Sequence, residues 1–495
     1  MAERNYITAE NIVVSFGEQE VLRFDTLRVH EGEKIGLVGA NGAGKTTLLK
    51  LIAGELRPDK GKLICNCEVL FFRQFGDGAD SRTARDHSGS VDGRELSLLG
   101  VKDRLGQEGV SGGEETRLRL ARVFSAERPL LLLDEPTSHL DLEGIDLLRA
   151  KLLQIPTLIL ISHNRALMNA VCTRIIAIEN AALKSVDGNY DDYLRLKEEA
   201  YMRALTEYEQ YTGEIRRLKN AYREKKAQAR RVEKKPRNLS ASGAKAIAFS
   251  GKRKPEDKAR SKERAARNIL MRIEHMEVKE KPKEEAKIRP DFRLTDPPEN
   301  RIIISGEHIS FSYPDGTRIF RDAAFRIGRG ERVAITGKNG AGKTTLLHLI
   351  RDRSGIYVVP KAKIGFMEQN LSQLDPEKTV LENSMAVSIQ REDITRMILS
   401  RMLLTSRDIQ KKVSVLSGGE RIKLSFAMLF VSDINVIALD EPTNFLDLPS
   451  IEALENLFRE YEGTMLFVSH DETFIQRVAT RILLVKDGQI HEQVV

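Results

Sequence analysis

The chain has 495 residues, of which 41% are hydrophobic and 31% charged, and a formal net charge of +7. This composition is typical of a globular protein, and the length predicts two or three domains. Its longest apolar runs are far shorter than the ~20 residues that a membrane span needs, the N-terminus lacks a secretory signal pattern, and three cysteines cannot build a disulfide framework. We therefore expect a cytoplasmic protein and exclude secreted and membrane-embedded classes.

Four sequence blocks occur twice, in the same order. Residues 39–46 recur at 337–344, an offset of 298, whereas 111–114, 134–137 and 162–163 recur at offsets of 306, 306 and 307. Self-similarity with so little drift indicates a duplicated domain. We place the first copy at 1–195 and the second at 300–495, each long enough for its own core.

The two copies have the same pattern of short apolar segments and helix-forming segments. Glycine-rich or acidic residues follow most of the apolar segments. The pattern predicts helices at 46–53, 115–122, 344–350 and 421–429, and strands at 34–38, 130–133, 158–161, 332–336, 436–439, 465–468 and 482–485. Alternating strands and helices predict an α/β fold with a mainly parallel sheet in each copy.

The segment 196–299 between the copies is strongly basic. From 211 to 290 it holds 26 Lys and Arg against 11 Asp and Glu, while the rest of the chain has a net charge of −8. Tyrosines and leucines at alternating three- and four-residue steps predict a long helix over 196–235, with a second helix downstream and a tip near 236–255. We interpret the segment as a helical hairpin with a polyanionic partner; a flexible charged linker is the alternative.

The pattern GxxxxGK[ST] occurs once in each copy, between a predicted strand and a predicted helix. Glycines let backbone N–H groups close around phosphate oxygens, the lysine reaches the β- and γ-phosphates, and the hydroxyl serves Mg²⁺. The chain therefore predicts two ATP sites, each with bound Mg²⁺. Their residues are Gly39, Ala40, Asn41, Gly42, Ala43, Gly44, Lys45, Thr46 and Thr47, and Gly337, Lys338, Asn339, Gly340, Ala341, Gly342, Lys343, Thr344 and Thr345.

Paired acids follow the second apolar strand of each copy. Asp134 and Asp440 end these strands, where a carboxylate can hold the Mg²⁺ shell. Glu135 and Glu441 come next and point to the opposite side, so they are candidates for the general base that activates water.

A third block, Ser-Gly-Gly-Glu, precedes a helix in each copy and provides a second anion-binding helix end. With it, the chain resembles the ATP-binding cassette ATPases over about four fifths of its length: the blocks are similar to their Walker A, signature and Walker B motifs. The resemblance implies two cassettes meeting head to tail, each Walker A facing the other cassette's signature. The signature residues are Ser111, Gly112, Gly113 and Glu114, and Ser417, Gly418, Gly419 and Glu420.

The same resemblance implies further site residues. Gln74 and Gln369 resemble the Q-loop glutamine that also joins the metal shell, and His163 and His470 resemble the switch histidine at the γ-phosphate. Two departures from the family pattern are Val110 before the first signature and Asn164 after the first histidine. Asp141 and Asp447 fall in the D-loops, and Phe16 and Tyr313 in the adenine-stacking positions.

Two cassettes without transmembrane segments, joined by a basic hairpin, resemble the ABC-F family. This resemblance implies a monomer that binds the bacterial ribosome at the tRNA exit site, near P-site tRNA and large-subunit rRNA, rather than membranes or DNA. We assign rRNA contacts to the hairpin residues Arg230, Arg231, Lys234, Lys235, Phe249, Lys252, Arg253 and Lys254.

Only 65 residues separate Thr46 from Ser111, against 73 in the second copy, so no arm is inserted in the first cassette. We also expect no basic tail, because the chain stops after the predicted strand 482–485. These features favour the antibiotic-resistance type, which dislodges drugs at the peptidyl-transferase centre or exit tunnel, over a housekeeping translation factor. The sequence also leaves open an ATPase subunit of a transporter and a DNA-maintenance ATPase.

Overall fold

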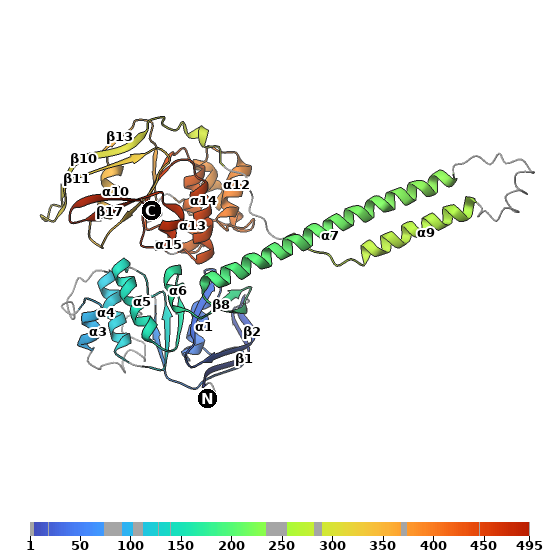
Figure 1. Cartoon of the computed structure of the whole chain (residues 1–495), viewed down its shortest axis with the longest axis horizontal. Helices are drawn as coiled ribbons and strands as arrows, with labels where there is room; N and C mark the ends of the chain where they lie inside the picture. The colour runs from blue at the N-terminus through green and yellow to red at the C-terminus, as the bar shows by residue number, and fades with distance from the viewer. Residues whose placement is uncertain are drawn as a thin grey trace, which may run out of the picture. The chain divides into compact units, whose positions relative to one another are not determined.

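The computed structural model describes residues 4–17, 19–73, 92–101, 112–126, 128–138, 140–233, 255–281, 290–367, 374–444 and 446–494. Residues Met1–Tyr193 and Ala286–Val495 form one compact unit, and Leu194–Glu285 form a second. Figure 1 shows the elements in chain order by colour.

The first copy contains a six-stranded sheet in the order β5-β6-β7-β3-β8-β9, parallel except for the last pair. A three-stranded antiparallel sheet in the order β2-β1-β4 accompanies it. The strands are β1 (Asn5–Phe16), β2 (Gln19–His30), β3 (Lys34–Gly39), β4 (Lys60–Cys65), β5 (Val69–Phe72), β6 (Leu130–Asp134), β7 (Leu158–Ile161), β8 (Arg174–Glu179) and β9 (Ala182–Asp187). The helices are α1 (Lys45–Ile52), α3 (Gly93–Leu98), α4 (Gly112–Phe124), α5 (Leu142–Gln154) and α6 (Arg165–Val171).

The second copy repeats this arrangement, with sheets in the orders β14-β15-β16-β12-β17-β18 and β11-β10-β13. Its strands are β10 (Ile302–Ser312), β11 (Arg318–Gly328), β12 (Arg332–Thr336), β13 (Tyr357–Val358), β14 (Ile364–Phe366), β15 (Val436–Asp440), β16 (Thr464–Val468), β17 (Arg481–Lys486) and β18 (Gln489–Val494). Its helices are α10 (Lys343–Arg351), α11 (Val380–Val387), α12 (Glu392–Arg401), α13 (Gly418–Val431), α14 (Leu448–Glu460) and α15 (Glu472–Val478), with short 3₁₀ turns η2 (Phe292–Thr295), η3 (Asp408–Gln410) and η4 (Val413–Val415).

These elements confirm the α/β fold class and the predicted strands that carry the motifs. Because both faces of the parallel strands are covered, strands such as β6 and β7 are buried along their whole length. Two features were not predicted. The antiparallel sheets went unnoticed, and the chain does not stop after the strand at 482–485, since β18 follows and pairs antiparallel with β17.

The second unit contains most of α7 (Tyr190–Glu233) and α9 (Pro255–Glu274). The predicted pair of helices is confirmed, and an ion pair joins them: Arg272 of α9 lies 2.7 Å from Glu214 of α7. Lys279, which follows α9, lies 3.6 Å from Glu207 of α7. The first helix begins six residues earlier than the expected residue 196. Asn189 explains this start, because its side chain accepts from the N–H of Asp192 and so caps the helix.

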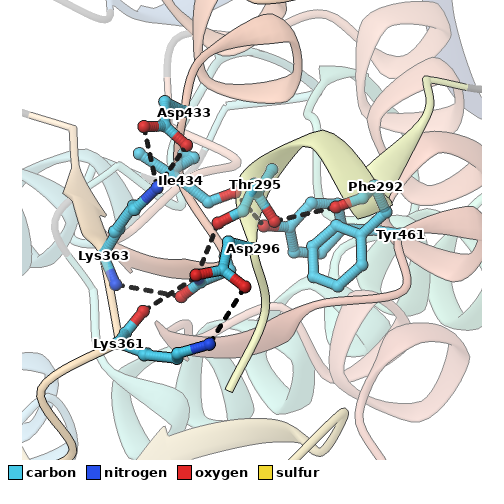
Figure 2. Close-up of polar contacts among 9 residues, drawn as sticks. Phe292, Thr295, Asp296, Lys361, Lys363, Asp433, Ile434 and Tyr461 are labelled. Carbon is cyan, nitrogen blue, oxygen red and sulfur yellow. Dashed lines mark hydrogen bonds and ion pairs between the residues drawn. The ribbon is translucent and has the colours of Figure 1, made fainter. Parts of the chain in front are cut away.

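The chain enters the second cassette through η2, whose surroundings Figure 2 shows. Asn435 fastens this turn to the body of the cassette. The buried Asn435 side chain donates to the carbonyls of Thr295 (3.3 Å) and Lys361 (3.0 Å) and accepts from the N–H of Lys363 (2.9 Å). Phe292 of η2 also packs edge-on against Tyr461. This anchor lies directly before β15, the strand that ends in Asp440.

Candidate active site

The two phosphate-binding loops connect β3 to α1 and β12 to α10. Their last glycines, Gly44 and Gly342, have φ of 102° and 106°, a left-handed conformation that strains any other residue. A Cβ at Gly342 would also come within 2.3 Å of Ile319. The loops therefore need glycine both for their shape and for close packing. In each loop the backbone N–H groups at the start of the helix point toward a common anion-binding position.

The loop lysines are held at the centre of these loops. The Lys45 ammonium donates to the carbonyls of Gly39 (2.8 Å) and Ala40 (3.0 Å), and Lys343 repeats both contacts in the second loop. Burial lowers the pKa of Lys45 and of Lys343, although nearby carboxylates oppose the change. An anionic phosphate in the loop is the natural partner for such a partly desolvated ammonium.

Each loop threonine contacts the aspartate that ends the neighbouring strand. The Thr46 hydroxyl donates to Asp134 Oδ2 at 2.8 Å, and Thr344 donates to Asp440 Oδ2 at 2.7 Å. A hydroxyl and a carboxylate are the hard oxygen ligands that Mg²⁺ prefers, and this ion takes its remaining ligands from phosphates and water. Within the described residues there is no group of three or more His, Cys, Asp or Glu that could hold a metal by itself. The pairs therefore suit a magnesium ion that arrives with a nucleotide.

Glu135 and Glu441 follow these aspartates, and both have a φ of 49°. A left-handed non-glycine residue costs free energy and is concentrated at functional sites. Burial raises the pKa of Glu135 to about 8 and that of Glu441 to about 7, and in each case the preceding aspartate adds to the rise. A carboxylate with its pKa raised to this range is a stronger base than an ordinary glutamate.

The switch histidines lie against these glutamates. His163 Nε2 is 3.1 Å from Glu135 Oε1, and its backbone N–H donates to Oε2 at 3.3 Å; His470 has the same two contacts with Glu441, both at 3.3 Å. Burial lowers the pKa of His163 to about 3 and that of His470 to about 4, so both imidazoles are neutral at pH 7. Asn164 departs from the family's aspartate but keeps one of its roles, since its side chain caps α6 as Asp471 caps α15.

The two cassettes contact each other through their phosphate loops. The Asn41 N–H donates to Asp447 Oδ2 of the second cassette at 2.6 Å. In the opposite direction, Asp141 accepts from the Asn339 N–H, and Glu143 pairs with Lys338 at 2.7 Å. Each D-loop therefore contacts the phosphate loop of the other cassette, as head-to-tail pairing requires.

One cavity of about 1120 Å³ runs between the cassettes. It is lined by both phosphate loops, both general-base candidates and both histidines, with Gly113, Gly418 and Gly419 from the signatures. In the second signature, Ser417 accepts from the Glu420 N–H, and Glu420 accepts from the Ser417 N–H, which makes a capping box at the start of α13.

The adenine-position aromatics also line this cavity. Phe16 is 55% exposed and Tyr313 is 41% exposed, so both rings present area for stacking. The Tyr313 hydroxyl lies 2.9 Å from Thr345 Oγ1, which ties one ring to the phosphate loop. Arg230 and Arg231 are in the last turn of α7, and both are exposed. The other predicted site residues lie outside the described part of the chain: Gln74, Ser111, Lys234, Lys235, Phe249, Lys252, Arg253, Lys254 and Gln369.

One pair of residues near the sites was missed by sequence reasoning. Arg117 of α4 forms an ion pair with Asp141, and Lys423 of α13 lowers the pKa of Asp447, although burial opposes that effect. Each basic residue comes six positions after the signature serine. This shared spacing in both copies was the signal that could have revealed the link between signature helix and D-loop.

Comparisons with known proteins agree with this geometry. The family described as "ABC transporter" matches residues 22–138 and 320–444. The chain is 34% identical to the erythromycin resistance ATP-binding protein MsrA of Staphylococcus epidermidis, over 95% of this chain and 96% of that protein. It is 32% identical to ABC transporter F family member 5 of Arabidopsis thaliana (98% and 76% covered) and 29% identical to the ribosome protection protein VmlR of Bacillus subtilis (99% and 88%).

Among solved structures, the RNase-L inhibitor has a similar fold, with a TM-score of 0.63 and 18% identity, over 98% of this chain and 91% of that one. No helix in the described part of the chain is long and apolar enough to cross a membrane.

Proposed function

The chain belongs to the ABC-F family of ATP-binding cassette ATPases, and from this membership we propose that it is a ribosome-protection factor. In this proposal it binds the bacterial ribosome, its hairpin enters the tRNA exit site beside P-site tRNA, and it dislodges antibiotics from the peptidyl-transferase centre or exit tunnel. ATP binding closes the cassettes, and hydrolysis releases the protein.

The residues of each site have separate roles in hydrolysis. Lys45 and the loop N–H groups neutralise the phosphates, while Glu135 accepts a proton as water attacks the γ-phosphorus and the bond to the ADP oxygen breaks. His163 holds the Glu135 carboxylate through the contacts described above. Thr46, Asp134 and Gln74 would hold Mg²⁺ in the first site, and Thr344, Asp440 and Gln369 would hold it in the second. The bound ion would supply positive charge to the phosphate oxygens.

The observation that carries the ribosome proposal is the basic hairpin between two ATPase cassettes. The second half of α7 has a series of exposed cations, and acidic residues are few there. Release of counterions from rRNA phosphates would favour binding by such a helix. The exposed cations are Arg216, Arg217, Lys219, Arg223, Lys225, Lys226, Arg230 and Arg231.

The resistance role draws its support from the names of two relatives. One is called an erythromycin resistance protein and the other a ribosome protection protein, and both are similar over nearly the whole chain. A housekeeping translation factor of the same family is the second candidate, because family members without such a name are comparably similar. The exposed cations on α7 suit either role.

Drug susceptibility of a sensitive bacterium separates the two candidates. We expect expression of the chain to raise the inhibitory concentration of at least one class among macrolides, lincosamides, pleuromutilins and streptogramins. The matched control is the chain with Lys45→Ala and Lys343→Ala, which should lose ATP binding and protection together. Unchanged susceptibility to every class, with co-sedimentation on ribosomes, would favour the housekeeping role; failure to co-sediment would reject both.

A further inference from the structure

One buried ion pair crosses between the cassettes away from the ATP sites. Arg165, the first residue of α6, donates from Nη1 to both carboxylate oxygens of Glu455 in α14, at 2.8 and 3.0 Å. Arg165 is fully buried and Glu455 is 3% exposed. Figure 1 shows α6 and α15, which lie in contact near this pair.

Neighbouring contacts reinforce this side of the interface. Arg477 of α15 approaches Glu455 at 3.2 Å, and the Tyr190 hydroxyl donates to Glu452, one turn earlier on α14, at 3.0 Å. Two guanidinium nitrogens of Arg165, Nε and Nη2, have no hydrogen-bond partner among the described residues. An arrangement of the cassettes that left the buried Arg165 without its counter-ion would cost considerable free energy. The Arg165–Glu455 pair therefore controls which surfaces can meet.

The duplication places the opposite charges at the two equivalent positions. Arg165 and Glu472 are the first residues of α6 and α15, each two positions after its switch histidine. Glu455 and Arg149 are the eighth residues of α14 and α5, each eight positions after its D-loop aspartate. Both charges are therefore reversed between the copies.

We propose that this reversal makes each cassette accept only the other kind of cassette as its partner. When a first and a second cassette meet, Arg165 faces Glu455, and the duplication puts the unlike charges of Arg149 and Glu472 at the equivalent positions. If two first cassettes from separate chains met in the same way, Arg165 would face Arg149; in two second cassettes, Glu472 would face Glu455. Repulsion and the removal of counter-ions at a buried position exclude both like pairings.

The two equivalent sides are unequal in this structure. Arg149 pairs with Asp146 at 2.7 Å and is 40% exposed, and among the described ion pairs it has none with Glu472. The Arg165 side therefore provides the firm contact, and the Arg149 side acts chiefly by repelling a wrong partner. Tyr190 and Arg477 also make their contacts on the Arg165 side.

An exchange of charges within the full-length chain tests the proposal. Arg165→Glu with Glu472→Arg keeps the net charge but makes unlike cassettes repel and each cassette complementary to its own kind. We expect the wild type to remain monomeric with ATP. The exchanged chain should lose about tenfold or more of its ATP hydrolysis at low concentration and should associate as its concentration rises. Light scattering and a concentration series of hydrolysis rates measure this.

The control reverses all four charges: Arg165→Glu, Glu455→Arg, Arg149→Glu and Glu472→Arg. The fourfold reversal again lets a first cassette pair with a second one and makes two cassettes of the same kind repel. We therefore expect a monomer that regains most of the rate of ATP hydrolysis. The exchanged chain, the fourfold reversal and the reference chain with which they are compared all carry Arg477→Gln, because Arg477 would otherwise oppose the reversed charge at position 455. If the exchanged chain stays a fully active monomer, or if the fourfold reversal recovers nothing, the charges do not select the partner. Neither readout depends on ribosomes, so the result is independent of the proposed function.

Discussion

At the scale of single residues, the two general-base candidates are alike in conformation as well as in chemistry. Glu135 and Glu441 share the same left-handed φ of 49°, and each N–H donates to a carbonyl on the neighbouring strand, at 2.9 and 3.0 Å. This hydrogen bond fixes the backbone where the strand ends. It turns the glutamate toward the histidine while the preceding aspartate stays with the loop threonine. The strain thus separates the roles of two adjacent acids.

Replacing both glutamates by glutamine should remove the base without removing the site. We expect Glu135→Gln with Glu441→Gln to slow ATP hydrolysis by about 10²–10⁴-fold, while affinity for a fluorescent ATP analogue changes little. Glutamine keeps the size of the side chain and cannot accept the proton from water. Glu307→Gln, at an exposed position of β10, is the control and should hydrolyse normally. Near-normal turnover in the double variant would remove the general-base role from these residues.

Asp408 gives a pH-dependent prediction at the start of η3. Burial raises its pKa, but hydrogen bonds from Lys411 and Thr405 outweigh this effect and hold the pKa at about 2. A carboxyl with a lowered pKa stabilises the fold above its ordinary pKa of about 3.8, and this contribution disappears as the pH falls toward 2. Asp408→Asn should lower the melting temperature at pH 7, and the difference from wild type should shrink between pH 4 and pH 2. A difference that stays constant would contradict the assignment.

At the scale of elements, one asparagine, Asn435, joins η2 to the start of β15. Asn435→Ala would leave a buried carbonyl and a part-buried carbonyl and N–H without their partner, which costs about 1–3 kcal/mol. We expect this loss in urea unfolding of the full chain. Lys361→Ala is the matched control, because it removes only the exposed pair with Asp296 and should change stability by less than about 0.5 kcal/mol. Equal effects of the two variants would show that Asn435 does not anchor η2.

The basic face of α7 should contribute to ribosome binding through charge alone. Changing Lys225, Lys226 and Arg231 to Gln should weaken co-sedimentation. The slope of the logarithm of the binding constant against the logarithm of salt concentration should become shallower by roughly 0.7–0.9 for each phosphate that is no longer bound, by analogy with nucleic-acid duplexes and single strands. These side chains are exposed, so the helix should keep its circular dichroism. The control removes three exposed cations from the antiparallel sheet, Arg28, Lys60 and Lys62. An identical salt slope in both variants would mean that α7 does not contact phosphate.

At the scale of the whole molecule, hydrolysis and drug displacement should be separable. Phe249 lies in the stretch of chain between α7 and α9, and an aromatic ring can stack on a base for ~1–3 kcal/mol. We expect Phe249→Ala to reduce resistance and to leave ribosome-stimulated ATP hydrolysis largely intact. Deletion of residues 238–250 should change the set of drug classes that are resisted more than Phe249→Ala does. If this deletion changed neither resistance nor spectrum, the stretch would have no part in protection.

The sequence alone determined those features of this protein that depend on residues close together in the chain. The phosphate loops, Asp134 with Glu135, the signature blocks and the two linker helices are local patterns, and duplication displayed most of them twice. Helix periodicity and strand runs depend on the same short spacings, so the α/β class followed from them. The earlier start of α7 at Tyr190 and the extra strand β18 were missed because short polar segments carry little periodic signal.

Only the tertiary structure decided how distant residues meet. The contact between Asn41 and Asp447 joins residues 406 positions apart, and that between Arg165 and Glu455 joins residues 290 apart. Asn435 likewise reaches the carbonyl of Thr295 across 140 positions. Nothing in local spacing specifies such partners, because they depend on which surfaces the packed sheets and helices bring together. Charge reversal between the copies was visible in the sequence, but its meaning required the buried interface.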